Sequence, residues 1–148
     1  MDDQVMSPAL DLQAEFRTEA AAAFSFLHEE AGFAHPEAAE VLPFSGTALF
    51  FRGPELDVEV QLYDGREPEV VTGLAVVGPD GVRGRRVGLD RLYVAAGCGP
   101  AQDVPGQAPK RRSTLKRVGQ HATALRQLMS HLSTPDLSQL ITRLTALP

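Results

Sequence analysis

The histidines are the first residues of this sequence that could bind a metal ion or transfer a proton. They stand at positions 28, 35, 121 and 131. His28 and His35 are seven residues apart, which is not the i,i+4 spacing that places two ligands on one helix face. A metal site would need one of them to meet His121 in the fold. We therefore expect exposed or helix-end histidines, with no bound metal and no cofactor.

Cys98 is the only cysteine of the chain, so no internal disulfide can form. A nucleophilic cysteine needs a lowered pKa and a histidine base, and nothing in the sequence places a histidine beside Cys98. The phosphate-binding GxxxxGK[ST] loop, the GxGxxG fingerprint and the GxSxG motif are all absent. The sequence therefore predicts that the protein is not an enzyme.

Carboxylates occur in close pairs, among them Glu29 with Glu30 and Asp57 with Glu59. General acid–base catalysis needs one carboxyl group with a raised pKa, which usually comes from burial. Asp57 and Glu59 lie on the polar side of the alternating segment ELDVEVQLYD (55–64). We expect a solvated strand face there, or a surface that binds a partner.

The basic run PKRRSTLKR (109–117) could bind an anion at the start of a helix. It holds Lys110, Arg111, Arg112, Lys116 and Arg117 in a chain of net charge −5. The run has no aromatic residue for base stacking, and nucleic-acid-binding domains are usually strongly basic. Pairing with the protein's own acids or plain solvation is the main interpretation, ahead of a protein partner and of nucleic acid.

Charge is distributed unevenly along the chain. Residues 1–74 carry 15 acidic and 3 basic side chains, whereas residues 75–148 carry 4 acidic and 11 basic ones. Either the two halves attract each other within one fold, or the surface is dipolar and steers a charged partner.

The hydrophobic pattern predicts a single α+β domain over residues 1–148, a usual domain length. Apolar residues at helical spacing predict a helix over 8–31 that ends at Gly32. Two segments, 47–52 and 55–64, read as a hairpin through Gly53 and Pro54, and 55–64 should have one buried and one wet face. The remaining predicted elements are strands over 69–77 and 82–87, a short helix or alternatively a strand over 89–97, a loop over 98–109, a helix capped by Ser113 or Thr114, and a helix over 135–147. An antiparallel meander of about four strands should therefore pack one face against the helices.

The expected location is the cytoplasm. The acidic N-terminus lacks the basic start and apolar run of a secretory signal. No apolar stretch reaches the roughly 18 residues of a membrane span, and a single cysteine fits a reducing compartment.

Four segments together resemble small bacterial proteins of the toxin-immunity type. They are FLHEEAGF (26–33), ELDVEVQLYD (55–64), VGLDRLYVAAG (87–97) and LKRVGQHATALRQLM (115–129). The resemblance is one of pattern rather than of a specific motif, and it covers most of the chain. It implies a cytoplasmic inhibitor of a cognate toxin that has no catalytic residues.

The sequence thus favours a small protein-binding module, either an immunity-type inhibitor or a chaperone-like adaptor. Its candidate partner-binding residues are Asp57, Glu59, Tyr63, Glu29 and Glu30. A homodimer is a variant of this hypothesis, because a one-sided sheet and amphipathic helices can pair across a two-fold axis. The alternative is a nucleic-acid-binding or regulatory protein that uses the basic residues of 83–117, namely Arg83, Arg85, Arg86, Lys110, Arg111, Arg112, Lys116 and Arg117.

Overall fold

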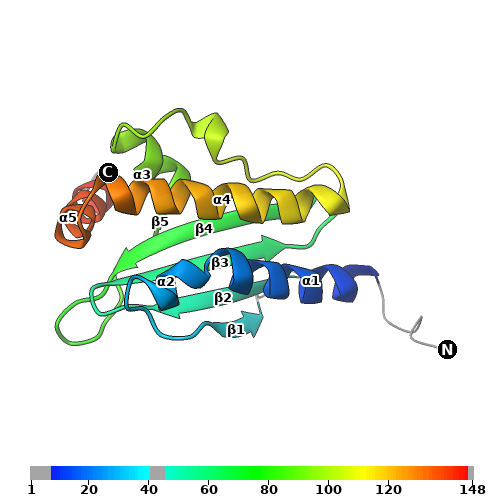
Figure 1. The fold of residues 1–148 in the computed structure, drawn as a ribbon, viewed down its shortest axis with the longest axis horizontal. Helices are drawn as coiled ribbons and strands as arrows, with labels where there is room; N and C mark the ends of the chain where they lie inside the picture. Colours follow the sequence, from blue (N-terminus) through cyan, green and yellow to red (C-terminus); the bar gives the residue numbers. More distant parts are fainter. Residues whose placement is uncertain (1–7, 41–45, 147–148) are drawn as a thin grey trace.

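The computed structural model of this chain describes residues 8–40 and 46–146. Its helices are α1 (Pro8–Ala23), α2 (Ser25–Glu29), α3 (Leu89–Ala95), the short 3₁₀ helix η2 (Ala101–Asp103), α4 (Arg111–His131) and α5 (Thr134–Thr145). Its strands are β1 (Glu37–Glu40), β2 (Gly46–Arg52), β3 (Leu56–Tyr63), β4 (Glu69–Val76) and β5 (Val87–Gly88). Helices α1, α2 and α4 lie in front of a five-stranded sheet (Figure 1). This confirms the predicted α+β fold class.

The sheet is an antiparallel meander in the order β1-β2-β3-β4-β5. The predicted hairpin through Gly53 and Pro54 is confirmed, with Phe51 opposite Val58 and Arg52 opposite Asp57. Strand β1 was missed, because its four exposed Glu and Ala residues carry no strand signal of their own. They are held only by pairing with β2.

The predicted strand over 82–87 is wrong. In its place the chain forms one isolated bridge between Val77 and Arg83, and then the two-residue strand β5. The segment leaves the regular ladder because its arginine side chains reach the carboxylates of β3, as described below.

The predicted helix over 8–31 is broken at Phe24, which ends α1 and precedes α2 with φ −99° and ψ 12°. Phe24 is fully buried, and its ring centroid lies 6.0 Å from that of Phe51 and 6.3 Å from that of Phe26. The break therefore allows the side chains of both Phe24 and Phe26 to enter the core. Gly32, with φ 81°, turns the chain after α2, as its place in the sequence predicted.

The core lies between the sheet and the helices. Strand β3 contributes Leu56, Val58, Val60 and Leu62, and α4 contributes Val118, Leu125 and Leu128, all at most 1 % exposed. Burying each such side chain stabilises the fold by about 1.5–3 kcal/mol. Helix α1 packs beside α4 and over β2 and β3, while α3 and α5 contact β4 and β5.

The two C-terminal helices are confirmed, with shifted starts. Helix α4 begins at Arg111 after Lys110, which provides no side-chain cap, rather than at Ser113 or Thr114. Helix α5 is capped by Ser133, whose hydroxyl accepts a hydrogen bond from the Asp136 backbone N–H. Within the described residues, no helix has both the length and the apolar character that crossing a membrane requires.

Candidate protein-interaction surface

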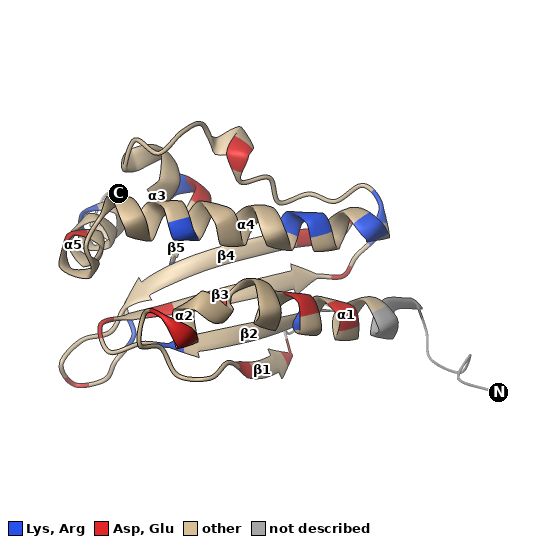
Figure 2. Ribbon diagram, viewed as in Figure 1, with Lys and Arg blue, Asp and Glu red and all other residues tan. Residues whose placement is uncertain are grey.

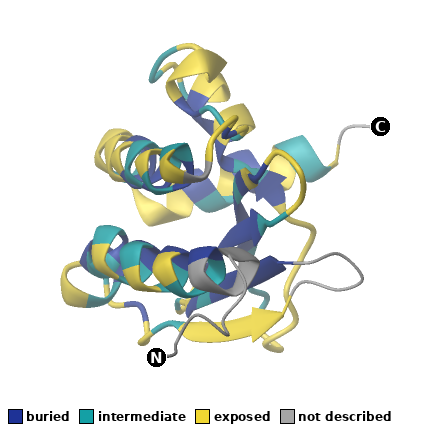
Figure 3. Ribbon diagram, turned by 90° about the vertical axis from the view of Figure 1, so that its right-hand side faces the viewer, coloured by how far each residue is buried: buried dark blue, intermediate teal, exposed yellow. Residues whose placement is uncertain are grey.

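The polar side of β3 is buried, contrary to the prediction of a wet face. Asp57, Glu59 and Gln61 are only 7 %, 8 % and 6 % exposed. Side chains alternate along a strand, so these three point away from the apolar residues that meet α1 and α4. Figure 3 shows those helices on one side of the sheet. The burial of Asp57 and Glu59 must therefore come from other side chains on the opposite face.

Arginines cover Asp57. The Nε atom of Arg83 donates to Asp57 Oδ2 at 2.9 Å, and Arg52 Nη1 lies 3.9 Å from the same oxygen. The backbone N–H of Gly53 donates to Asp57 Oδ1 at 3.2 Å. A buried carboxylate without such partners would cost several kcal/mol of desolvation, so these groups offset the cost of burying Asp57.

Arg86 covers Glu59 in the same way, by an ion pair between Nη1 and Oε1. The Gln61 amide donates to Glu59 Oε2 at 2.6 Å, and the half-buried Tyr63 hydroxyl donates to Gln61 Oε1 at 2.7 Å. Gly73 makes this arrangement feasible, because a Cβ atom there would overlap the aliphatic part of Arg86. Arg86 therefore lies flat across β4 to reach β3.

The most exposed groups of this sheet face include three arginines and Glu37 of β1, whose side chain is 57 % exposed and pairs with Arg52 at 3.0 Å. The side chains of Arg52, Arg83 and Arg86 are 49 %, 36 % and 42 % exposed, against 9–10 % for the two carboxylates beneath them. We call these three residues the arginine layer. Arg83 also lies over the half-buried ring of Phe50, at 5.4 Å from its centroid, which is a cation–π contact. A partner would therefore meet oriented guanidinium groups on this face, one of which is also paired with the exposed Glu37.

Two ion pairs of this face join the basic half of the chain to its acidic half. Attraction between the two halves within one fold therefore explains part of the uneven charge distribution. Arg83 and Arg86 come from the basic half, and Asp57 and Glu59 from the acidic half. Arg52 was not among the sequence candidates. The register of the predicted hairpin, which sets Arg52 opposite Asp57, is the signal that would have found it.

Glu29 and Glu30 lie at the end of α2, far from this face along the chain. Glu30 forms a two-pronged ion pair with Arg126 of α4, with both N–O distances at 3.2 Å. The Arg126 guanidinium also lies 4.6 Å from the centroid of the Phe26 ring. Glu30 therefore ties α2 to α4, while Glu29 is exposed. The structure does not bring these two glutamates together with Asp57 and Glu59 in one site.

The basic start of α4 is not neutralised by ion pairs. Lys110, Arg112 and Lys116 are exposed and form no ion pair with any described residue. Arg117 donates instead to the Gln107 carbonyl at 2.8 Å and to Gln120 Oε1 at 2.9 Å. The side chain of Arg111 lies outside the described part of the structure.

The two groups of basic residues lie at opposite ends of the molecule. Helix α4 begins at one end, whereas the connection between β4 and β5 that carries Arg83 and Arg85 lies at the other (Figure 2). Arg85 donates a hydrogen bond from Nη1 to the carbonyl of Thr145, the last residue of α5, at 3.3 Å. The residues of the nucleic-acid alternative thus do not form one continuous patch.

Histidines do not form a metal site in the described residues, where no group of three or more His, Cys, Asp or Glu side chains converges. The rings of His28 and His35 lie 3.7 Å apart, and His28 Nδ1 is 2.9 Å from the Phe33 carbonyl. His121 is buried on α4. Its Nε2 donates to the Pro105 carbonyl, and its Nδ1 therefore accepts from the Thr72 hydroxyl, each at 2.8 Å.

Burial shifts the pKa values of both His121 and Cys98. Burial lowers the pKa of His121, and the nearby Arg117 lowers it further, while the hydrogen bond to Pro105 and the charge of Asp90 act in the opposite direction. Burial raises the pKa of the Cys98 thiol, which disfavours the reactive thiolate.

Comparison of this chain with protein-family models, with curated proteins and with solved structures finds no match.

Proposed function

We propose that this protein is a small protein-binding module, an inhibitor of the immunity kind or an adaptor, which binds an acidic surface of its partner. The observation that supports this function is the arginine layer. Three partly exposed guanidinium groups are held over buried carboxylates, on the sheet face that points away from α1 and α4.

Arginine suits an interface because its planar group binds carboxylates through two parallel hydrogen bonds. Arg83 donates to Asp57 through Nε. Its Nη1 and Nη2 atoms form no hydrogen bond with a described residue. An arginine that is already held in place loses less conformational freedom when it binds. Residues of this type are also common among those that dominate binding energy.

Asp57 and Glu59 then have a positioning role. Their carboxylates orient the guanidinium groups from below and do not themselves reach the partner, because each side chain is at most 10 % exposed. This replaces the expectation that the acids themselves form the contact surface.

A pull-down from a lysate of the source organism tests the proposal with two matched triple variants. The first replaces Arg52, Arg83 and Arg86 by Gln, and the second replaces Lys110, Arg112 and Lys116 by Gln. Both remove three positive charges, so an effect of net charge alone would be the same in each. We expect the first variant to lose a stoichiometric protein partner that the second retains.

The alternative, binding of nucleic acid, has its own supporting observation in the unpaired Lys110, Arg112 and Lys116 at the start of α4. It predicts the reverse pattern, in which nucleic acid co-purifies and the second triple variant loses it. On duplex DNA the log of affinity would fall by roughly 0.9 per neutralised phosphate for each log unit of salt. Retention of nucleic acid at high salt would count against this alternative.

A further inference from the structure

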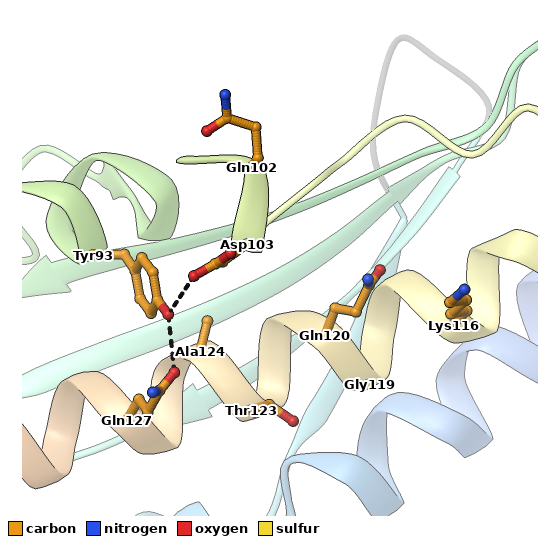
Figure 4. Close-up of a pocket in the computed structure, with 9 residues that line it drawn as sticks. All are labelled: Tyr93, Gln102, Asp103, Lys116, Gly119, Gln120, Thr123, Ala124 and Gln127. Carbon is orange, nitrogen blue, oxygen red and sulfur yellow. Dashed lines mark hydrogen bonds between the residues drawn. The ribbon is translucent and has the colours of Figure 1, made fainter. Parts of the chain in front are cut away.

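A groove runs along α4 on the other side of the molecule from the arginine layer. It lies between α4 and the segment of α3 and η2, and its volume is about 620 Å³. Its lining residues are mostly polar: Tyr93, Gln102, Asp103, Lys116, Gly119, Gln120, Thr123, Ala124 and Gln127 (Figure 4). This volume lies within the usual range of ligand sites, roughly 300–1,000 Å³.

One end of the groove is a fixed acidic site. The Tyr93 hydroxyl lies 2.9 Å from both Asp103 Oδ2 and Gln127 Oε1. The phenol proton is shared between these two acceptors, and the carbonyl oxygen of Gln127 faces the phenol (Figure 4). Burial raises the pKa of Tyr93, and Asp103 raises it further, which keeps that proton in place. The NH₂ group of Gln127 is then left to donate.

Gly99 shapes this end. A Cβ atom at position 99 would stand 2.6 Å from Asp103 Oδ2 and 3.2 Å from the Tyr93 hydroxyl oxygen. A side chain at this position would therefore displace the Asp103 carboxylate from its present place.

The other end is basic. The exposed Lys116 ammonium makes no ion pair with a described residue. Arg117 donates to Gln120 Oε1 at 2.9 Å, which orients that amide and leaves its NH₂ group to donate. Figure 4 shows Lys116, Gln120 and Gln127 following one another along α4, with Tyr93 and Asp103 beside Gln127.

Gly119 forms part of the groove wall without a packing reason inside the chain. Beyond its own helix backbone, no atom lies within 4 Å of the place that a Cβ would take. A glycine inside a helix costs about 1 kcal/mol relative to alanine. Its presence allows a ligand to approach the helix backbone closely.

We infer that this groove binds a short peptide in an extended conformation, with an ammonium or basic group near Asp103 and a carboxylate near Lys116. Gln127 lies eleven positions after Lys116 on α4, which is about 16 Å along the axis. An extended chain covers that distance in about five residues. The Gln120 and Gln127 amides each leave an NH₂ group to donate, and the carbonyl oxygens of a peptide can accept from both. This site goes beyond the proposed function and does not depend on it.

Titration of ¹⁵N-labelled protein with pentaalanine tests the inference by backbone amide shifts. We expect saturable shifts at residues 99–103 and 116–127 at millimolar peptide. Acetylation of the peptide's N-terminus should weaken binding about two- to fivefold in the wild type but not in Asp103→Asn. Amidation of its C-terminus should do so in the wild type but not in Lys116→Met. Lys110→Met is the matched control and should bind as the wild type does.

The end-group comparisons use the wild-type protein, so they hold even if a variant fails to fold. A doubly capped pentaalanine that binds as well as the uncapped peptide would overturn the inference. So would inorganic phosphate alone reproducing all the shifts, since the groove would then be a simple anion site. The doubly capped peptide Lys-Ala-Ala-Ala-Glu carries its charges on side chains instead of on its ends. If it binds as well as pentaalanine, the ligand is a segment of a longer chain. If it binds more weakly, the ligand is a free peptide.

Discussion

Arg83 donates from Nε to the Asp57 carboxylate at 2.9 Å, and this contact joins the basic half of the chain to its acidic half. It forms on the sheet face that alternation alone predicts to be wet. The same pairing recurs between Arg86 and Glu59, so the two acids of β3 are both satisfied from the connection between β4 and β5. Stability and binding should therefore respond together to changes in this connection.

Replacing Arg86 by Ala should destabilise the protein by about 1–3 kcal/mol, because the buried Glu59 carboxylate would lose its charged partner. Arg85→Ala is the matched control, since Arg85 is exposed and its hydrogen bond goes to the Thr145 carbonyl rather than to a buried carboxylate. It should change the free energy of unfolding by less than about 0.5 kcal/mol. Urea unfolding followed by circular dichroism measures both, and equal losses would contradict the assigned role of Arg86.

Gly73→Ala should displace Arg86 without removing its charge, because the new Cβ overlaps the aliphatic part of that side chain. We expect this variant to weaken partner binding while the net charge of the protein stays the same. Gly65→Ala is a suitable control, because no atom lies within 4 Å of its Cβ position. If Gly73→Ala bound the captured partner with unchanged affinity, the arginine layer would not be the contact surface.

The buried His121 should make the stability of the protein depend on pH. Its pKa is lowered in the folded state, so the unfolded chain, with a pKa of about 6.5, binds a proton more readily. The contribution of neutral His121 to the stability of the fold is therefore fully present above about pH 6.5. It is lost as the pH falls through the lower pKa of the folded state. The slope from one such group cannot exceed about 1.4 kcal/mol per pH unit.

His121→Gln is the variant that isolates this effect, because glutamine can still donate to the Pro105 carbonyl but does not titrate. Unfolding midpoints in urea at pH 7, 6 and 5 should fall more steeply for the wild type than for the variant. Parallel curves would show that His121 does not contribute to the acid sensitivity.

Cys98 should react slowly with alkylating reagents. Burial raises the pKa of its thiol, and only the thiolate is the nucleophile. We expect iodoacetamide to modify Cys98 in the folded protein more slowly than it modifies glutathione at the same pH, and at a comparable rate once the protein is unfolded in urea. Faster modification in the folded state would point instead to an activated cysteine.

Much of the fold could be read from local patterns. The alternation in 55–64 set the inner face of β3, and Leu56, Val58, Val60 and Leu62 are all buried as it predicted. The hairpin at Gly53 and Pro54 and the helical stripe of Val118, Leu125 and Leu128 were equally visible. These features depend on residues close in sequence, whose spacing reports the period of a strand or a helix.

The tertiary structure decided the outer face of the sheet and the groove. Whether Asp57 is wet or buried depends on Arg83, which reaches it from a distant turn, and no local period encodes that contact. The break at Phe24 arises because packing against Phe51 outweighs helical continuity. Tyr93, Asp103 and Gln127 meet because α3 packs against both η2 and α4, so their polar side chains carry no signal until the chain has folded. The sequence by itself thus determined the elements and their apolar faces, and long-range contacts between side chains determined which polar residues form sites.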